Sequence, residues 1–171
     1  MLHLIGAVLT ILGTTGFGLS LKKEMKQRIY HLKYIKKLFF YLQNEVEYHK
    51  STLQEACENI SKRAEEPYLK LYGKINLDMI ENRGYPFGEV WKRNLIIMRD
   101  KIPITNKDMD LLMQFMEESF QDGKMQCKEI GFYIDKMQEL IDLLENEYRN
   151  KSKIYVSLGV MSGILCTIIF I

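Results

Sequence analysis

The chain has 171 residues and a formal net charge of +2, from 24 Lys and Arg against 22 Asp and Glu. This near balance excludes the strongly basic surface of a nucleic-acid-binding protein, and a mean hydropathy of −0.17 excludes a polytopic transporter. We therefore expect no nucleic acid among its partners. The average conceals two apolar ends around a polar middle of residues 22–153, which is long enough for one domain with its own core.

The first apolar segment, residues 1–21, has no charge between Leu4 and Leu21 and is followed by a lysine pair. A secretory signal peptide has its positive charge before the apolar region and a small-residue cleavage site after it, and that order is reversed here. We predict a transmembrane helix over residues 1–21. Small residues recur at every fourth position and are expected to pack against another membrane helix; they are Gly6, Thr10, Thr14 and Gly18.

Basic residues gather where the polar middle meets each apolar end. Glu24 is the only acidic residue among those that follow the first end. Because Lys and Arg next to membrane helices remain on the cytoplasmic side, we predict a cytoplasmic middle domain of residues 22–153. Specific binding of anionic lipids is the alternative explanation for the same residues. The membrane-surface basic cluster consists of Lys22, Lys23, Lys26 and Arg28 after the first end, and of Lys151 and Lys153 before the second.

In the polar middle, apolar residues recur at alternating spacings of three and four from Leu32 to Ile60, which is the pattern of a helix. A start signal interrupts this stripe at "HKSTLQEA", where Ser51 or Thr52 can cap a new helix with an acidic or amide residue three positions on. The two predicted helices end near Tyr48 and at about Glu66.

Further helical segments follow, separated by turn signals that contain glycine or proline. The stretch "PITNKDMD" is predicted to be a loop in which Thr105 or Asn106 caps the next helix, and "QDG" is predicted to break that helix. No segment alternates apolar and polar residues as a half-buried strand does. We predict an all-α fold, with a bundle of about six antiparallel helices between two terminal transmembrane helices. The predicted segments are residues 68–83, 87–101, 109–120 and 124–148.

The second apolar segment, residues 154–171, contains 18 residues without a charge. Eighteen helical residues extend roughly 27 Å, against a hydrocarbon thickness of about 30 Å. We therefore predict a second transmembrane helix that continues the last helix of the middle domain. Gly159 and Gly163 form the G-x-x-x-G pattern that lets membrane helices approach closely.

No motif for catalysis or cofactor binding occurs in the chain, which lacks a phosphate-binding glycine loop, an H-E-x-x-H, a G-x-S-x-G and a calcium loop. The three histidines are far apart, and the three cysteines show no metal or redox spacing. We predict no catalytic residue, metal site or cofactor, and no enzymatic activity. Trp91, the only tryptophan, is either a core residue or an anchor for a partner, and Phe115 belongs to the same class.

Two other functions stay open at the level of the sequence. One is a membrane-tethered enzyme with an unrecognised site, suggested by His31, His49 and the many carboxylates. The other is a holin-like pore-forming protein, suggested by two short apolar segments with small residues. Clustered ionisable groups in one pocket favour the first, and leakage of liposomes caused by the purified protein favours the second.

The chain resembles the stage III sporulation protein AB family of endospore-forming bacteria over essentially its whole length. The stretches that carry the resemblance are "LIGAVLTILGTTGFG", "NEVEYHKSTLQEA", Trp91 after a glycine turn, "LLMQFMEE" and "SLGVMSGILCTIIFI". The most specific are "NEVEY" with the following S-T-L-x-E-A, and the closing S-L-G-x-x-S-G. The chain departs from the family pattern at two places. At Thr52 the family usually has proline, and after the position of Phe115 the family usually has a glycine pair, where this chain has Met116.

The resemblance implies a component of the complex that bridges the two membranes around the forespore, located in the mother-cell membrane. The middle domain is then similar to the helical cytoplasmic domains of the inner-membrane platform proteins of type II secretion and type IV pilus systems. The implied role is a scaffold or adaptor between a cytoplasmic ATPase and membrane ring proteins during endospore formation. The implied partners are membrane lipids and other proteins of this secretion-like channel complex, including the ATPase, with no small-molecule substrate.

Overall fold

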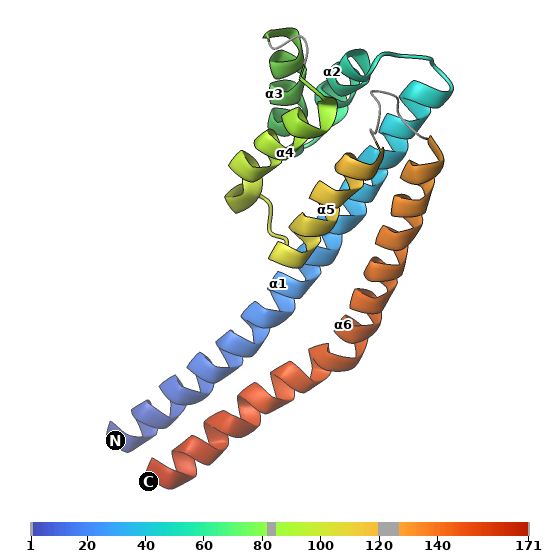
Figure 1. The fold of residues 1–171 in the computed structure, drawn as a ribbon. Helices are drawn as coiled ribbons and strands as arrows, with labels where there is room; N and C mark the ends of the chain where they lie inside the picture. The colour runs from blue at the N-terminus through green and yellow to red at the C-terminus, as the bar shows by residue number, and fades with distance from the viewer. Residues whose placement is uncertain (1, 82–84, 120–126, 171) are drawn as a thin grey trace. The chain divides into compact units, whose positions relative to one another are not determined.

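The structure is a computed structural model that describes the backbone of residues 2–81, 85–119 and 127–170. These residues form α-helices and one 3-10 helix, η1, and contain no β-strand (Figure 1). The predicted all-α class is therefore confirmed for the described part of the chain. The elements are α1 (Leu2–Glu47), α2 (Leu53–Arg63), α3 (Tyr68–Glu81), α4 (Phe87–Met98), η1 (Arg99–Lys101), α5 (Asn106–Ser119) and α6 (Cys127–Phe170).

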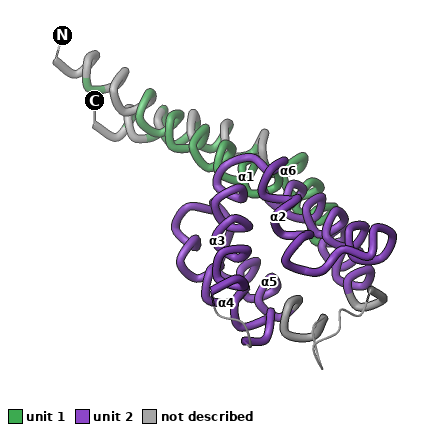
Figure 2. Tube along the Cα trace, turned by 90° about the horizontal axis from the view of Figure 1, so that it is seen from above, with its two compact units in different colours: residues 1–30, 140–171 green, residues 31–139 purple. Residues whose placement is uncertain are grey.

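The chain divides into two compact units, of which unit 1 comprises residues 1–30 and 140–171 and unit 2 comprises residues 31–139 (Figure 2). Helices α1 and α6 contribute to both units, whereas α2 to α5 lie within unit 2. The predicted limits of the middle domain, at residues 22 and 153, stay predictions.

The predicted apolar stripe of α1 is buried in unit 2, with Leu32, Ile35, Phe39 and Leu42 between 0% and 4% exposed. Burial ends with the helix: Val46 is half-buried, and His49, which the pattern places on the stripe, is exposed. The stripe resumes on α2, whose buried residues are Ala56, Cys57 and Ile60. Helical periodicity therefore identifies the core-facing side of both helices.

Trp91 of α4 lies at the centre of the unit 2 core and is 2% exposed. Its ring centroid lies 5.9 Å from that of Phe39 in α1, 5.7 Å from that of Tyr72 in α3 and 6.4 Å from that of Phe87 in α4. Aromatic rings at such separations attract one another in addition to the apolar area that they bury. One side chain thus connects α4 to two other helices.

Helix α2 begins with a capping box, as the sequence predicts. The backbone N–H of Glu55 donates to Thr52 Oγ1 at 3.3 Å, and the backbone N–H of Thr52 donates to Glu55 Oε2 at 2.8 Å. These bonds satisfy two N–H groups that the start of a helix leaves without intrahelical partners. They also lower the pKa of the Glu55 carboxyl, mainly through the backbone bond to Thr52 and then through the Thr52 side chain.

Three predicted boundaries differ from the structure. The predicted loop "PITNKDMD" is wrong from its fourth residue, because α5 already begins at Asn106. Thr105 explains this early start, since its Oγ1 accepts from the backbone N–H of Asp108 at 3.3 Å while Asp108 Oδ2 accepts from the backbone N–H of Thr105 at 2.9 Å. Helix α2 ends at Arg63 rather than Glu66, and the last turn of the predicted 87–101 helix is the 3-10 helix η1.

Helix α6 runs without a break from Cys127 to Phe170, so the predicted continuity of the last helix into the second apolar segment is confirmed. The predicted break at "QDG", residues 121–123, lies outside the described residues.

In unit 1, the first part of α1 and the last part of α6 run side by side (Figures 1 and 2). No helix in the described part of the chain is both long and apolar enough to cross a membrane, so the structure does not support the predicted transmembrane helices at residues 1–21 and 154–171. Large apolar side chains of these segments are nevertheless exposed, by 47% to 69%: Leu12, Phe17, Leu19, Ile154, Leu158, Met161, Ile164, Leu165 and Ile168.

Replacing Trp91 by alanine tests its central place in the core. We expect the free energy of unfolding to fall by about 3–5 kcal/mol, as for other buried aromatic residues replaced by alanine. Trp91→Phe should cost less, because it keeps a ring and removes the indole N–H, which has no hydrogen-bond partner in the structure. Urea unfolding measures the free energy of unfolding of both Trp91 variants. The control is Tyr48→Ala, at a side chain that is 73% exposed, for which we expect a change of at most about 0.5 kcal/mol.

A second prediction concerns the capping box. Removing the Thr52 hydroxyl by Thr52→Ala should raise the pKa of Glu55 toward its ordinary value, whereas Thr52→Ser should keep it low. A carboxylate whose pKa is lower in the folded state than in the unfolded state stabilises the folded state at pH values above its unfolded-state pKa. This contribution is lost as the pH falls through its folded-state pKa. Carboxyl NMR titration measures the pKa. The rise in Thr52→Ala should be partial, because the backbone N–H of residue 52 still donates to the Glu55 carboxylate; an ordinary Glu55 pKa in the wild-type protein contradicts the capping assignment.

Candidate functional site

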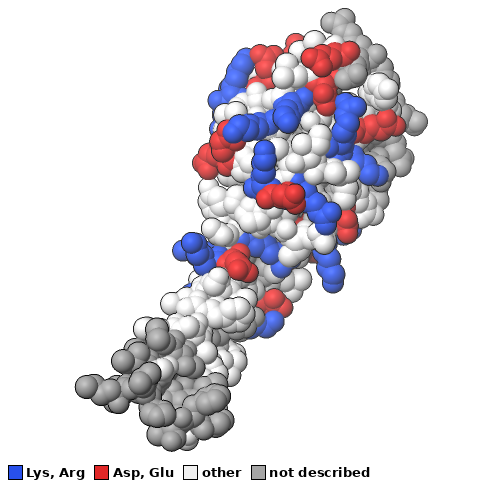
Figure 3. Space-filling model, turned by 90° about the vertical axis from the view of Figure 1, so that its left-hand side faces the viewer, with Lys and Arg blue, Asp and Glu red and all other residues white. Residues whose placement is uncertain are grey.

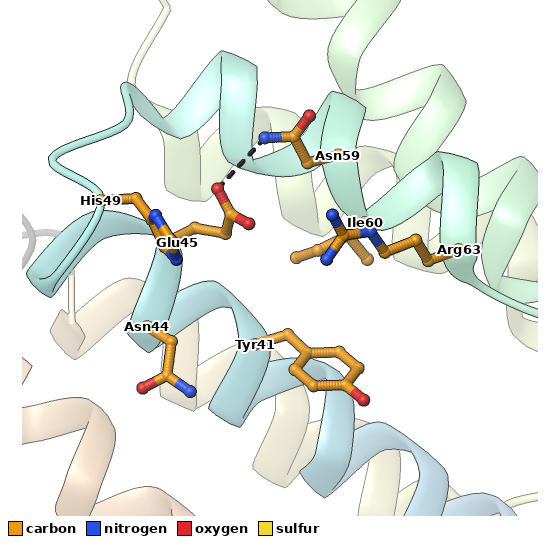
Figure 4. A pocket seen from close by; sticks show the side chains of 7 residues that line it. All are labelled: Tyr41, Asn44, Glu45, His49, Asn59, Ile60 and Arg63. Carbon is orange, nitrogen blue, oxygen red and sulfur yellow. Dashed lines mark hydrogen bonds between the residues drawn. The ribbon is translucent and has the colours of Figure 1, made fainter.

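A cavity of about 150 Å³ with polar lining residues lies in unit 2 between the end of α1 and α2 (Figure 4). Three of its seven lining residues, Asn44, Glu45 and His49, belong to the stretch "NEVEYHKSTLQEA", one of the stretches that the sequence analysis singled out. We call it the α1–α2 pocket. Its lining residues are Tyr41, Asn44, Glu45, His49, Asn59, Ile60 and Arg63.

Glu45 links the three segments that form the α1–α2 pocket. Its Oε2 accepts one hydrogen bond from Ser51 Oγ, in the connecting turn, and another from Asn59 Nδ2, in α2, both at 3.1 Å. The backbone N–H of Ser51 also donates to the Glu45 carbonyl at 3.1 Å. Bonds to an ionised carboxylate are stronger than those between neutral groups, so Glu45 holds the turn and α2 against the end of α1.

The turn between α1 and α2 reverses the chain through Lys50, which has a φ of 55°. A residue with a side chain rarely adopts this left-handed conformation, which is common at helix ends. Next to it, the backbone N–H of His49 donates to the Asn44 carbonyl at 3.3 Å. His49 is thereby fixed at the rim of the α1–α2 pocket, and its side chain is exposed.

The α1–α2 pocket combines hydrogen-bond donors with one carboxylate. Figure 4 shows the Arg63 guanidinium directed toward the space in front of Glu45, and Tyr41 on the α1 side of the pocket. Among the described residues, Arg63 has no ion-pair partner. Such a set can recognise a polar or charged group of a partner, because guanidinium and imidazole groups donate hydrogen bonds while the carboxylate accepts them.

The same arrangement lacks the parts of a nucleophilic site. Ser51 Oγ donates directly to the Glu45 carboxylate, with no imidazole between them to act as the general base of a catalytic triad. The described residues contain no group of His, Cys, Asp and Glu side chains that could hold a metal ion.

His31 lies outside the α1–α2 pocket and does not form a cluster with His49. Its Nδ1 lies 2.9 Å from the Tyr68 hydroxyl, and burial lowers the pKa of its imidazole. Cys57 is fully buried, and burial raises the pKa of its thiol to about 12, so it carries no thiolate at neutral pH. Both residues therefore serve the packing of unit 2.

The other residues that the sequence analysis singled out are dispersed over the chain. Trp91 lies in the core. Of the small-residue face, Gly18 is buried and Thr14 half-buried, whereas a Cβ at Gly6 would meet no atom within 4 Å. In the basic cluster Lys23, Lys26 and Lys151 are exposed and Lys22 and Arg28 half-buried. The side-chain surroundings of Thr10, Phe115, Lys153, Gly159 and Gly163 lie outside the described part.

Sequence reasoning missed the α1–α2 pocket, although it identified the turn that forms it. Asn59 and Arg63 are four residues apart and therefore share one face of α2, and that spacing was the only signal. Their proximity to Glu45, 14 and 18 positions earlier, depends on the angle of the turn.

Glu45→Ala tests whether this carboxylate holds the α1–α2 pocket together. We expect a loss of about 1–3 kcal/mol in the free energy of unfolding, because Ser51 and Asn59 lose their acceptor. Urea unfolding of Asn59→Ala and of the double variant measures the coupling, expected at about 0.5–3 kcal/mol. The matched control is Glu47→Ala, two residues on, with a change of at most about 0.5 kcal/mol. Equal effects of the two glutamate variants contradict the role given to Glu45.

Comparison with known proteins covers nearly the whole chain. The sequence profile of the stage III sporulation protein AB family matches residues 3–171. Stage III sporulation protein AB of Bacillus subtilis (strain 168) is 24% identical over 166 residues, which are 96% of this chain and 96% of the relative. A solved structure of stage III sporulation protein AB (SpoIIIAB) has a TM-score of 0.63 and 19% identity, and covers 71% of this chain and 96% of the other. On the profile match, the chain belongs to the stage III sporulation protein AB family.

Proposed function

We propose that this sporulation protein is a membrane-attached adaptor of the complex between mother cell and forespore, and that it couples a cytoplasmic ATPase to membrane ring proteins. The observation that carries the proposal is the family match over residues 3–171, which includes both apolar ends and the helical middle. In this proposal the protein organises other proteins and catalyses no reaction itself.

Membrane attachment in this proposal depends on the two apolar ends. Leu4 to Leu21 and Ile154 to Ile171 contain no charge. On the face that Figure 3 shows, the described surface next to the grey atoms is free of Lys, Arg, Asp and Glu. Exposed apolar surface costs about 25 cal/mol per Å² in water, so lipid contact stabilises these side chains. The basic cluster from Lys22 to Arg28 then lies at the level of the lipid headgroups, on the cytoplasmic side of the mother-cell membrane.

The adaptor role in this proposal belongs to unit 2. Its core is mainly apolar and closed around Trp91, with Asn94 and Asp108 among its buried residues, and the α1–α2 pocket lies at its surface. Arg63 and His49 at that pocket offer donors to a partner group, and Glu45 offers an acceptor. These are the features of a recognition surface, which supports binding to an ATPase or to a membrane ring protein.

Deleting the gene from its endospore-forming host should abolish or strongly lower the count of heat-resistant spores, and the wild-type gene should restore it. A variant with Leu158→Glu and Ile164→Glu should restore neither the spore count nor recovery of the protein in the membrane fraction, because a charge among lipid tails costs several kcal/mol. The control is Leu143→Glu, at a side chain 65% exposed in α6 but outside the two apolar ends.

Normal spore counts in the deletion strain contradict the sporulation role of this chain in its host. Normal membrane recovery of the Leu158→Glu, Ile164→Glu variant contradicts membrane attachment through the second apolar end. Leakage of liposomes caused by the purified wild-type protein alone contradicts the adaptor role and favours a pore-forming protein instead.

A further inference from the structure

The α1–α2 pocket contains two opposite charges that form no ion pair with each other. Figure 4 shows the Glu45 carboxylate on the α1 side and the Arg63 guanidinium directed toward it from α2. The ion pairs of the described residues include neither side chain, although Lys62, next to Arg63, pairs with Glu58 in the same helix. A group that enters the space between Glu45 and Arg63 is therefore acted on by a negative and a positive charge at once.

The hydrogen bonds of Glu45 orient its carboxylate. Its Oε2 accepts from Ser51 Oγ and from Asn59 Nδ2, both at 3.1 Å. In the described part of the chain no hydrogen bond ends at Oε1, which Figure 4 shows on the side of the carboxylate that faces the pocket. Because two donors hold Oε2, the carboxylate presents Oε1 to the pocket as an acceptor of fixed direction.

The size of the α1–α2 pocket limits its occupant to one short side chain. The pocket has a volume of about 150 Å³. A cavity of about this volume in another protein holds a single benzene ring. A helix, a strand or a lipid chain is therefore too large. Ile60, which is 3% exposed, also lines the pocket and offers an apolar contact to the methylene groups of such a side chain.

The mixed charge of the pocket decides which kind of side chain fits it best. A carboxylate of a partner is attracted by Arg63 but repelled by Glu45, and the reverse holds for an ammonium group. Either charged group must also lose its water, which costs more than desolvation of a neutral amide. A primary amide has N–H donors and a carbonyl acceptor, so it can bond to Glu45 Oε1 and to Arg63 at the same time.

We propose that the α1–α2 pocket binds the side-chain amide of a glutamine or asparagine in a partner protein. The amide N–H donates to Glu45 Oε1, and the amide carbonyl accepts from the Arg63 guanidinium. Both bonds include an ionised group, which makes them stronger than bonds between neutral groups. An apolar side chain of the same size leaves both charges without a bond and is rejected. This proposal names the partner group for the adaptor role proposed above and rests on that role for its biological setting.

The test uses the full chain in a neutral detergent and a set of Ala-Xaa-Ala peptides in which Xaa is Gln, Met, Glu or Lys. Acetyl and N-methylamide caps leave the Gln side chain as the only primary amide. NMR signals of the Arg63 Nε–H and the Glu45 carboxylate follow binding at millimolar peptide concentrations, because a group of so few atoms binds weakly. We expect the Gln peptide to shift both signals, and the other three peptides to bind at least about tenfold more weakly.

Two variants should change this preference in opposite directions. Arg63→Glu places two carboxylates in the pocket and should make the Lys peptide the strongest ligand. Glu45→Gln keeps an oxygen that can accept from Ser51 and Asn59 but removes the negative charge, and should make the Glu peptide the strongest ligand. The matched control Lys62→Glu makes the same change of charge in α2 at a side chain that is 64% exposed and does not line the pocket. It should keep the preference of the wild type, and a role of Arg63 in stability alone produces no change of preference.

Three results with the wild-type protein overturn the proposal: equal binding of the Gln and Met peptides, tighter binding of the Glu or Lys peptide, and no binding of the Gln peptide. A Gln preference that Arg63→Glu retains also overturns it, because the amide then binds elsewhere. None of these results changes the spore count of the deletion strain, so failure of this proposal is distinguishable from failure of the proposed function.

Discussion

The packing of Trp91 is the constraint on which unit 2 depends. Its ring contacts those of Phe39, Tyr72 and Phe87, and so connects α4 to α1 and α3. Trp91 Nε1 and Tyr72 Oη are buried without hydrogen-bond partners, at a cost of about 1–3 kcal/mol each. The apolar area of these large rings must therefore outweigh two unpaired polar groups. Because Trp91 fixes which side of α4 faces the core, it also fixes which side, including Ile96, faces outward.

A second, polar constraint acts where α1 meets α2. The stretch "NEVEYHKSTLQEA" is one of those in which the chain resembles the family, and its residues have specific structural tasks. Glu45 accepts bonds from the turn and from α2, and Thr52 and Glu55 cap the start of α2. The geometry of the α1–α2 pocket follows from these bonds. In this chain the stretch turns the backbone after a long helix, and the pocket is a consequence of that turn.

Periodicity predicted the helices well, because burial of one helical face leaves a clear mark in the sequence. The stripe from Leu32 to Leu42 and the capping box at Thr52 are examples. It failed at residues 106–110, where the polar letters of "NKDMD" suggested a loop. The predicted cap at Thr105 is confirmed by its reciprocal bonds with Asp108, but the helix starts directly after this cap and not at Met109. The predicted spans at the two ends are likewise not supported by the structure.

The sequence by itself determined the all-α class, the core-facing sides of α1 and α2, the cap of α2 and the family, because each depends on residues that are close together in the chain. The tertiary structure alone decided the roles of individual side chains. It placed Trp91 in the core rather than at a partner surface, brought Arg63 and Asn59 to Glu45, and left Ile96 and Ile97 exposed. These outcomes depend on how helices far apart in sequence cross one another, and side-chain spacing within one helix contains no information about that.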